Sequence, residues 1–426
     1  MGHSRVMKRV LVISPHFPPV NAPDMQRVRV ALPYFVEAGW EVTVLTVADP
    51  TPAAPVEPEL ASTVPTSVRI VRAHCWSRRW TRWLGFGNVA LRSLPFLFLT
   101  GSRLLGGRRY DVVYFSTTMF ITLPLGRLWK MLHGVPYVID LQDPWVSDYY
   151  ERPGAPPPPG GWKYRFAQGL GRLLEGWTLR GASGLLAVSA AYLDTVRTRY
   201  PGLRAVPSVE LPFGSPDPDL AHLRATLAQR PALLPAGGWR IAFAGALGPG
   251  QLAAVAVLFA ALAEARQAGP RVAVHFFGTS YDPAARPATL ALAAQYGLQD
   301  CVFEHPGRLR YFDALQVTLE ADANLLLGST DLAFTPSKTL AVLAAGRPVL
   351  TLAPVGSALL TRLAALGQTG LAFPDGPPEP ASVRAIVAWL QDLAAGRSAV
   401  PRASREWDAA HVAAVQLDIL ATARHA

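Results

Sequence analysis

The sequence is poor in cysteine and in charge. Its two cysteines, Cys75 and Cys301, lie far apart in a chain of 426 residues. They form neither a disulfide framework nor a metal-binding cluster, and so little cysteine favours a reducing compartment. Charged residues make up 16% of the chain and hydrophobic residues 50%. This balance excludes a disordered protein and is sufficient for two buried cores.

Long apolar runs are also missing. No stretch reaches the roughly 18 uncharged apolar residues that a membrane-spanning helix requires. The nearest, VALRSLPFLFLTGSRLL, is interrupted by Arg92, Pro95 and Arg103, so we expect no transmembrane helix. The N-terminal MGHSRVMKRVLVIS is basic and then apolar. Its apolar run is too short for a signal peptide and predicts a tail followed by a first strand.

Acidic residues are outnumbered by basic ones. Lys and Arg number 40 against 30 Asp and Glu, which gives a net charge of +10. A basic surface favours phosphorylated small molecules, anionic lipid or nucleic acid. Arginine, tryptophan and leucine gather in residues 74–110, which is typical of membrane interfaces; the alternative is an Arg-rich helix pair with its aromatics in the core. No nucleic-acid-binding module is recognised, so nucleic acid is not an expected partner.

Strand-like runs alternate with helix-like segments. RVLVIS (9–14), a proline-rich loop, a helical pattern ending at Gly39 and EVTVLTV (41–47) together predict a βαβ unit. A Pro- and Asp-rich stretch at 211–220 breaks this series, and a second series begins with WRIAFAGAL at 239–247. Continuous apolar strands separated by helices predict parallel sheets covered on both faces.

The expected fold class is therefore α/β, with two Rossmann-like doubly wound domains. The predicted boundaries are 1–210 for the first domain, 211–235 for a linker, 236–402 for the second domain and 403–426 for a C-terminal helix that packs on the first domain. PGAPPPPGG (153–161) predicts a surface loop, because proline fits inside neither series. No G-x-G-x-x-G follows a strand, which argues against a dinucleotide oxidoreductase.

Five segments resemble, in the same order, those of GT-B fold family 4-type glycosyltransferases that build bacterial surface polysaccharides. They are FPPVNAPDMQRVRVALPYFVEAGWEVTVLT, GVPYVIDLQDPW, LRGASGLLAVSAAYLDTVRTRYP, FAGALGP and TPSKTLAVLAAGRPVL. The resemblance implies two domains facing a cleft, the first binding the acceptor and the second the nucleotide sugar. It also implies a retaining, metal-independent hexosyl- or N-acetylhexosaminyl-transferase without a cofactor. The donor would be UDP-, GDP- or dTDP-linked, and the acceptor a glycan or a lipid-linked sugar.

Most of the predicted donor site lies in TPSKTLAVLAAGRP. Thr335 is the expected N-cap and Pro336 the first helical residue, so Ser337, Lys338 and Thr339 fall in the first turn. The free N–H groups and the positive helix end attract phosphate there. A lysine at that end opposes the helix dipole, which makes sense if a diphosphate lies between; the alternative is a solvated lysine. With the resemblance, Lys338 is a predicted catalytic residue that neutralises the diphosphate.

Gly245 and Gly248 complete the predicted donor site. They follow the strand IAFA, where glycine lets the backbone approach a ligand; an ordinary strand–helix turn is the alternative. Many relatives carry two glutamates across the diphosphate helix, and this chain has Ala333 and Ala341 instead. Two other functions therefore stay open, a non-catalytic binding or scaffold subunit and a GT-B nucleotide-sugar epimerase. An epimerase would need an acid-rich cleft.

The predicted acceptor residues lie where strands of the first series end, the edge at which open α/β sheets bind ligands. Asp143 is the second catalytic candidate, to position or deprotonate an acceptor hydroxyl or to stabilise charge on the donor sugar. The alternative for Asp143 is an Asx-turn before a proline. Gln142 stands where relatives often have histidine or arginine. His16, Asn21 and Arg27 belong to the first loop and its helix, which face the cleft in the resembling fold; a surface position is the alternative for Arg27.

The predicted location combines these observations. Without a spanning helix or a signal peptide, the chain is expected in the cytoplasm. A lipid-linked acceptor and the Arg- and Trp-rich segment 74–110 would hold it peripherally on the inner face of the plasma membrane.

Overall fold

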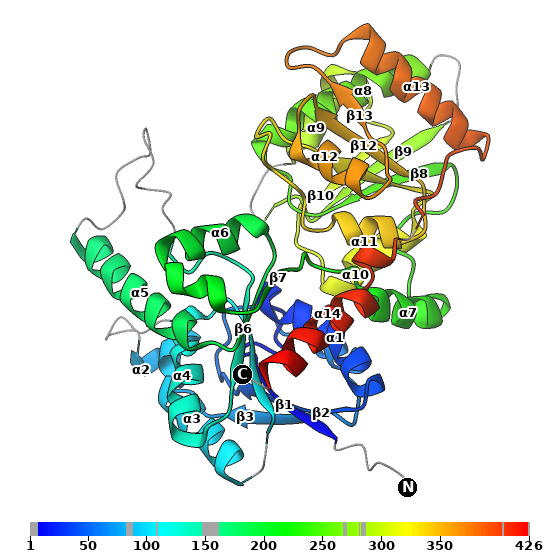
Figure 1. Cartoon of the computed structure of the whole chain (residues 1–426). Coiled ribbons are helices and arrows are strands. Elements are labelled where there is room, and N and C mark those ends of the chain that lie inside the picture. Colours follow the sequence, from blue (N-terminus) through cyan, green and yellow to red (C-terminus); the bar gives the residue numbers. More distant parts are fainter. Residues whose placement is uncertain are drawn as a thin grey trace, which may run out of the picture. The chain divides into compact units, whose positions relative to one another are not determined.

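The computed structural model describes residues 7–81, 88–107, 110–146, 162–266, 271–280, 282, 287–402 and 404–424. The chain forms two compact units, one of Met1–Gly214 with Ala409–Ala426 and one of Ser215–Asp408. Figure 1 traces the elements of each. The polyproline loop predicted at 153–161 lies outside the described residues.

The first unit is built on a seven-stranded sheet with the order β3-β2-β1-β4-β5-β6-β7. All of its pairings are parallel, and Val10 of the central strand lies beside both Val42 and Val112. The strands are β1 (Lys8–Ile13), β2 (Trp40–Val47), β3 (Arg69–Ala73), β4 (Val112–Ser116), β5 (Tyr137–Leu141), β6 (Gly184–Ala187) and β7 (Ser208–Glu210).

Two hydrophobic cores lie on the two faces of this sheet, because successive strand side chains point to opposite sides. Leu11 and Ile13 of β1 join one core, and Val10 and Val12 join the other. The first core is covered by α3 (Val89–Gly107), α4 (Pro124–His133), α5 (Trp162–Gly181) and α6 (Ala190–Arg199). The second is covered by α1 (Pro23–Glu37) and the last helix, α14 (Ala409–Ala423), which pack against each other (Figure 1). Short helical turns complete the unit: α2 (Arg78–Thr81), η1 (Pro58–Thr63), η3 (Phe120–Thr122) and η5 (Pro201–Ala205).

The second unit repeats this plan with a six-stranded parallel sheet in the order β10-β9-β8-β11-β12-β13. Its strands are β8 (Trp239–Ala244), β9 (Val272–Phe277), β10 (Val302–His305), β11 (Ala323–Leu327), β12 (Val349–Pro354) and β13 (Leu371–Phe373). Its helices are α7 (Asp217–Thr226), α8 (Leu252–Ala265), α9 (Ala288–Gln295), α10 (Tyr311–Glu320), α11 (Thr339–Ala344), α12 (Ala358–Ala365) and α13 (Pro380–Ala394), with turns η6 (Leu227–Gln229), η7 (Pro249–Gln251) and η8 (Arg405–Trp407). The predicted α/β class with two doubly wound sheets is confirmed.

The order of strands reverses once in each sheet. The reversal lies between β1 and β4 in the first unit and between β8 and β11 in the second. Helices on opposite faces diverge at such a point and leave a crevice beyond the carboxyl ends of the two strands, where ligands of open α/β sheets bind. We therefore expect functional side chains near the carboxyl ends of these four strands.

The stretch predicted as a linker, 211–235, is for most of its length part of the second unit. Helix α7 packs on α10, and Leu220, Leu223 and Leu234 are buried. Leu211 is buried with the second core of the first unit. The segment looked like a linker because its prolines and aspartates interrupt the strand–helix rhythm, but its leucines supply apolar contacts to the second unit.

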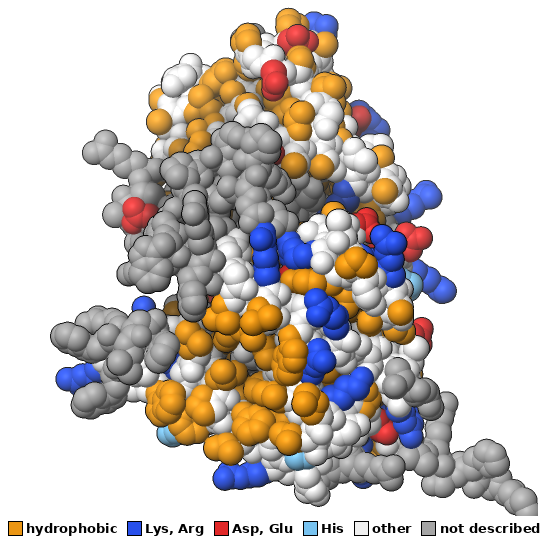
Figure 2. All heavy atoms as spheres, turned by 60° about the vertical axis from the view of Figure 1, so that its left-hand side comes forward, with side chains coloured by type: hydrophobic (Ala, Val, Ile, Leu, Met, Phe, Trp, Pro, Cys, Tyr) orange, Lys and Arg blue, Asp and Glu red, His pale blue; other side chains and the backbone are white. Residues whose placement is uncertain are grey.

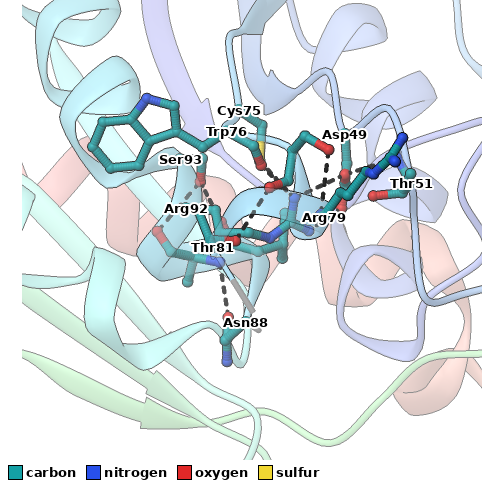
Figure 3. A network of polar contacts seen from close by, with 12 residues as sticks. Asp49, Thr51, Cys75, Trp76, Arg79, Thr81, Asn88, Arg92 and Ser93 are labelled. Atoms are coloured by element: carbon teal, nitrogen blue, oxygen red, sulfur yellow. Dashed lines mark hydrogen bonds and ion pairs between the residues drawn. The ribbon is translucent and has the colours of Figure 1, made fainter. Parts of the chain in front are cut away.

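The predicted membrane segment, 74–110, contributes much of its length to the first core. Residues 82–87 and 108–109 lie outside the described part, but Val89, Leu97 and Leu105 of α3 are buried. Arg92 is buried as well, and Figure 3 shows its guanidinium directed at the Asp49 carboxylate. Their closest atoms, Nη2 and Oδ2, are 2.5 Å apart. This arginine is a core ion pair and not a surface charge.

Further contacts hold the guanidinium of Arg92 in place. Its Nη1 donates to the Trp76 carbonyl oxygen at 2.6 Å and approaches Cys75 Sγ at 3.3 Å (Figure 3).

No helix in the described part of the chain is both long and apolar enough to cross a membrane.

Replacing Arg92 by alanine should lower the free energy of unfolding by about 3–5 kcal/mol, because the Asp49 carboxylate would stay buried without its cation. Urea denaturation of the full chain measures the change. Arg103→Ala, at an exposed position of the same helix, is the matched control and should change stability by no more than about 0.5 kcal/mol. Equal stability of the two variants would contradict the ion-pair assignment.

Candidate functional site

The switch point of the first sheet carries a histidine–aspartate pair. His16 follows β1, and Asp24 is the second residue of α1. His16 Nδ1 lies 3.0 Å from Asp24 Oδ1, and Thr117, directly after β4, donates its hydroxyl to Asp24 Oδ2 at 2.7 Å. Asp24 is 3% exposed, whereas the His16 side chain keeps 19% of its surface. A carboxylate at Nδ1 holds the ring proton there, so Nε2 is left as the hydrogen-bond and proton acceptor.

Asn21 supports the same loop from its buried side. Its side-chain amide donates to Glu57 Oε1 at 2.9 Å, and Gln26 donates to its Oδ1 at 2.9 Å. Asn21 is 7% exposed. The predicted acceptor residue Asn21 thus has both ends of its amide bound to protein, and it shapes the loop that presents His16.

Arg27 is a buried residue and not a surface helix residue. Its Nε lies 2.9 Å from Asp140 Oδ2, with both side chains at most 1% exposed. Its Nη2 donates to the Leu211 carbonyl oxygen at 2.6 Å, and its guanidinium carbon lies 5.3 Å from the centre of the Phe213 ring. The predicted acceptor contact Arg27 therefore anchors α1 to β5.

Gln142 belongs to the same buried network. Its Nε2 donates to Ser116 Oγ at 2.9 Å and to Asp140 Oδ2 at 3.2 Å. Tyr114 donates to the same Asp140 oxygen at 3.3 Å, and Gln416 of α14 donates to the Tyr114 hydroxyl at 2.9 Å. Burial raises the pKa of Asp140, and the neighbouring Arg27 charge and these hydrogen bonds act against the rise.

Asp143, the catalytic candidate after β5, is more accessible. It is exposed, unlike Gln142 beside it, yet partial burial still raises the pKa of its carboxyl group. Burial raises the pKa of Tyr192, and the charge of Asp143 adds to that rise. Close by in sequence, Trp145 stacks on Phe120 with ring centres 5.8 Å apart. A carboxylate with a raised pKa is a stronger base than a solvated one.

The switch point of the second sheet carries Lys338. Its amine donates to the Ala244 carbonyl oxygen at the end of β8 and lies 4.9 Å from the centre of the Phe243 ring. The residue as a whole is partly exposed, but burial of its amine lowers the pKa of Lys338 from 10.5 to about 8.

Gly245 makes room for this amine. It has φ +145°, and a Cβ atom placed there would lie 1.1 Å from Lys338 Nζ. Only glycine accommodates both the backbone conformation and the lysine. The structure thus brings together Lys338 and Gly245, two residues 93 positions apart that the sequence assigned separately to the donor site.

The helix predicted to start at Pro336 starts later. Helix α11 begins at Thr339 and has six residues, with Lys338 as its N-cap. Both the N–H and the hydroxyl of Thr339 donate to the Pro336 carbonyl oxygen, at 3.1 and 2.6 Å. Residues 336–339 therefore form a turn, Thr335 caps nothing, and Ser337 is exposed outside the helix. Of the backbone N–H groups in this turn, that of Thr339 is therefore taken by the Pro336 carbonyl oxygen.

Hydrogen bonds hold the loop after β8 in place. Gly248 donates its N–H to Gln251 Oε1 at 2.9 Å, and Gln251 donates to the Leu327 carbonyl oxygen at 3.1 Å. Thr330, which follows β11, donates its N–H to the Gly250 carbonyl oxygen at 2.9 Å. The alternative interpretation of Gly248 as part of a strand–helix turn accounts for these bonds. Among the described residues no group of three or more His, Cys, Asp and Glu side chains could hold a metal ion.

Comparison with known proteins assigns the first unit. Residues 26–214 match the family described as the glycosyl transferase 4-like domain. This part of the first unit is thus similar to that domain family. The expected resemblance to glycosyltransferases is thereby confirmed for the part of the chain that holds Arg27 and Asp143; the match begins after His16. A search of curated proteins found no match.

Solved structures extend the similarity over both units. A UDP-forming α,α-trehalose-phosphate synthase from Burkholderia xenovorans is similar at 12% identity and TM-score 0.56, covering 97% of this chain and 99% of that one. Anabaena HepE in complex with UDP is similar at 17% identity and TM-score 0.53. The match covers 97% of this chain and 100% of that one. A structure from Listeria monocytogenes, named as a UDP-N-acetylglucosamine 2-epimerase, is similar at 11% identity and TM-score 0.51. The match covers 96% of this chain and 94% of that one. At these identities the likeness shows the GT-B fold alone.

Sequence reasoning missed two residues at the switch point of the first sheet, Asp24 and Thr117. Asp24 looks in sequence like an acid that stabilises the first turn of a helix, and Thr117 follows a strand without any motif. Asp24 lies at the start of α1 and Thr117 directly after β4, and both elements border the reversal of strand order. Strand order is not visible in the sequence, so the pair could be found only after folding.

Lys338 should make stability depend on pH. Between pH 8 and 10.5 the unfolded chain still binds the proton that the folded chain has released, so folding becomes more favourable as pH rises. The free energy of unfolding of the natural chain minus that of Lys338→Met should therefore increase over this interval, by up to about 3 kcal/mol. Urea denaturation at several pH values measures it. Ser337→Ala is the uncharged control, and a difference independent of pH for Lys338→Met would refute the buried amine.

Proposed function

We propose that this chain is a glycosyltransferase that moves a sugar from a nucleotide-sugar donor to a hydroxyl group of a glycan or lipid-linked acceptor. The observation that carries the proposal is the placement of polar groups at both switch points. Lys338 lies over Gly245 at one, and His16 with Asp24 lies at the other. The glycosyl transferase 4-like domain supports it, as does HepE, which was crystallised in complex with UDP.

In this proposal the second unit binds the donor. An amine with a pKa of about 8 lies close to its titration point at neutral pH, and a diphosphate beside it would favour the ammonium form. Backbone at Gly245 and Gly248 and the turn at Ser337 and Thr339 would line the diphosphate. When the bond between the sugar C1 and the phosphate oxygen breaks, the diphosphate leaves with the electron pair, and the Lys338 charge stabilises it. Base and sugar stay open among UDP-, GDP- and dTDP-linked donors.

The first unit would bind the acceptor. His16 Nε2 would accept a hydrogen bond from an acceptor hydroxyl, and Asp143, whose pKa burial raises, would take the hydroxyl proton as the new bond to C1 forms. Arg27, Asn21 and Gln142 would act by holding the loops that present these groups. We further propose retention of anomeric configuration and independence of a metal ion, both of which rest on the family resemblance.

One observation favours a second candidate, a non-catalytic binding or scaffold subunit. Where many related sequences carry two glutamates, this chain has Ala333, which is exposed, and Ala341, which is partly buried. A chain without these carboxylates has fewer groups with which to orient a sugar and a ribose. Nucleotide binding without turnover would distinguish this candidate from the transferase. An epimerase shares the fold but would need acidic groups, and Lys338 has no carboxylate among its described contacts.

We also propose that the chain acts in the cytoplasm, at the inner face of the plasma membrane. The basic net charge of +10 supports attraction to an anionic surface. A lipid-linked acceptor would require such contact, because its sugar lies close to the bilayer.

Nucleotide binding tests the donor site. Thermal-shift measurements with UDP-, GDP- and dTDP-sugars should show stabilisation by at least one of them. Lys338→Ala should weaken that binding about 10- to 100-fold, the usual loss of one charge-assisted contact. Arg384→Ala, an exposed arginine of α13, is the control and should bind normally. If no nucleotide stabilises the natural chain, the transferase proposal is wrong.

Turnover tests the acceptor site. His16→Gln and Asp143→Asn should each lower kcat about 100-fold or more, since proton transfer and hydroxyl orientation are lost. Nucleotide affinity, measured by calorimetry, should stay within about twofold of the natural chain because both residues lie in the other unit. Normal kcat in both variants would remove these assignments.

A further inference from the structure

Large apolar side chains lie exposed on three adjoining helices of the first unit. Helix α4 packs against α3 on one side and α5 on the other. The side chains that share this exposure are Leu99 of α3, Leu128, Met131 and Leu132 of α4, and Leu170 and Leu173 of α5. Met131 is 71% exposed, Leu173 69% and Leu132 61%. We call these six side chains the apolar face.

Helical spacing places these side chains on the outer surface of the helices. Leu128, Met131 and Leu132 are three and four residues apart, which is one side of a helix. Leu125 and Trp129, on the adjoining side of α4, are buried in the first core. Figure 2 shows hydrophobic side chains gathered over this part of the first unit, with basic side chains beside them. Single exposed leucines are ordinary, but a contiguous group of them marks an interaction surface.

The charge of the three helices is of one sign. Their sequences, VALRSLPFLFLTGSRLLGG, PLGRLWKMLH and WKYRFAQGLGRLLEGWTLRG, contain one carboxylate, Glu175. Glu175 is buried, and its Oε2 lies 2.7 Å from Arg199 Nη1. Arg103 and Arg180 are exposed beside the apolar side chains. The outer surface of these helices therefore presents leucine, methionine and arginine, with no exposed carboxylate among its described residues.

We infer that the apolar face and its arginines form a docking surface for an anionic lipid bilayer. Leucine and methionine would enter the boundary between headgroups and acyl chains, and arginines at the same level would meet lipid phosphates. A protein partner matched to this surface would leave the arginines to be paired one by one, whereas a bilayer supplies phosphates everywhere. The inference rests on the proposed membrane attachment. It places the site on α3, which lies within residues 74–110, and adds α4 and α5.

Vesicle flotation of the full chain tests the surface, with phosphatidylcholine vesicles made with and without phosphatidylglycerol. The natural chain should bind the anionic vesicles in preference to neutral ones. The double variant Met131→Gln, Leu132→Gln should weaken vesicle binding about tenfold or more. Each substitution removes the free energy gained when an apolar side chain moves from water into the bilayer. The matched control, Val355→Gln with Val400→Gln, changes two exposed valines of the second unit and should bind as the natural chain does.

Charge reversal tests the basic component separately. Arg103→Glu should weaken binding to anionic vesicles by about fivefold or more and leave neutral vesicles unaffected, whereas Arg384→Glu in the second unit should change neither. Three results would overturn the inference: no vesicle binding by the natural chain, equal binding by the Met131/Leu132 and control variants, or a self-association in light scattering that the Met131/Leu132 variant abolishes without any vesicle binding.

Nucleotide thermal shifts on the same variants keep this inference apart from the proposed function. The Met131/Leu132 variant should bind the nucleotide sugar normally. If the natural chain shows nucleotide shifts but binds no vesicles, the docking surface is refuted and the transferase proposal stands. Vesicle binding without any nucleotide shift would do the reverse.

Discussion

The buried ion pair between Arg27 and Asp140 is the interaction on which the arrangement of the first unit depends. Asp140 lies inside β5, so its carboxylate is removed from water, and Arg27 of α1 supplies the opposite charge at 2.9 Å. Tyr114 of β4 and Gln416 of α14 extend the network. Removing either partner would leave a charge in the core. The pair therefore holds elements from both ends of the chain together, and α1 in turn carries Asp24 to His16.

The two sheets share a constraint and meet it with different residues. Both faces of each sheet are mostly apolar, so a charged side chain is stable there only beyond the strand ends or with a compensating partner. In the first unit the strand ends hold His16 against a buried carboxylate. In the second they hold Lys338 over Gly245, where a side chain larger than hydrogen has no space. A basic amine against backbone and an imidazole against a carboxylate suit a phosphate and a hydroxyl group, respectively.

Sequence-based expectations differ from the structure at a local turn before α11 and at two long-range ion pairs. Thr335 and Pro336 fit the rules for a helix start, yet Thr339 bonds back to Pro336 and delays the helix to residue 339. Arg27 and Arg92 were harder to place, because arginine side chains are mostly exposed in folded proteins. Their carboxylate partners, Asp140 and Asp49, are remote in the sequence, and no local pattern connects them.

The sequence by itself determined the fold class, the alternation of strands and helices, the presence of glycine and aspartate just beyond strand ends, and the presence of a lysine at a helix start. These features are local, because hydrophobic periodicity and turn residues act over a few positions. Tertiary structure alone decided which charges are buried as pairs and which apolar side chains stay outside. It placed Arg92 in the core and left Met131 and Leu173 in solvent. Exposure and pairing depend on the strand order and on which helices pack together, and neither is encoded in any single segment.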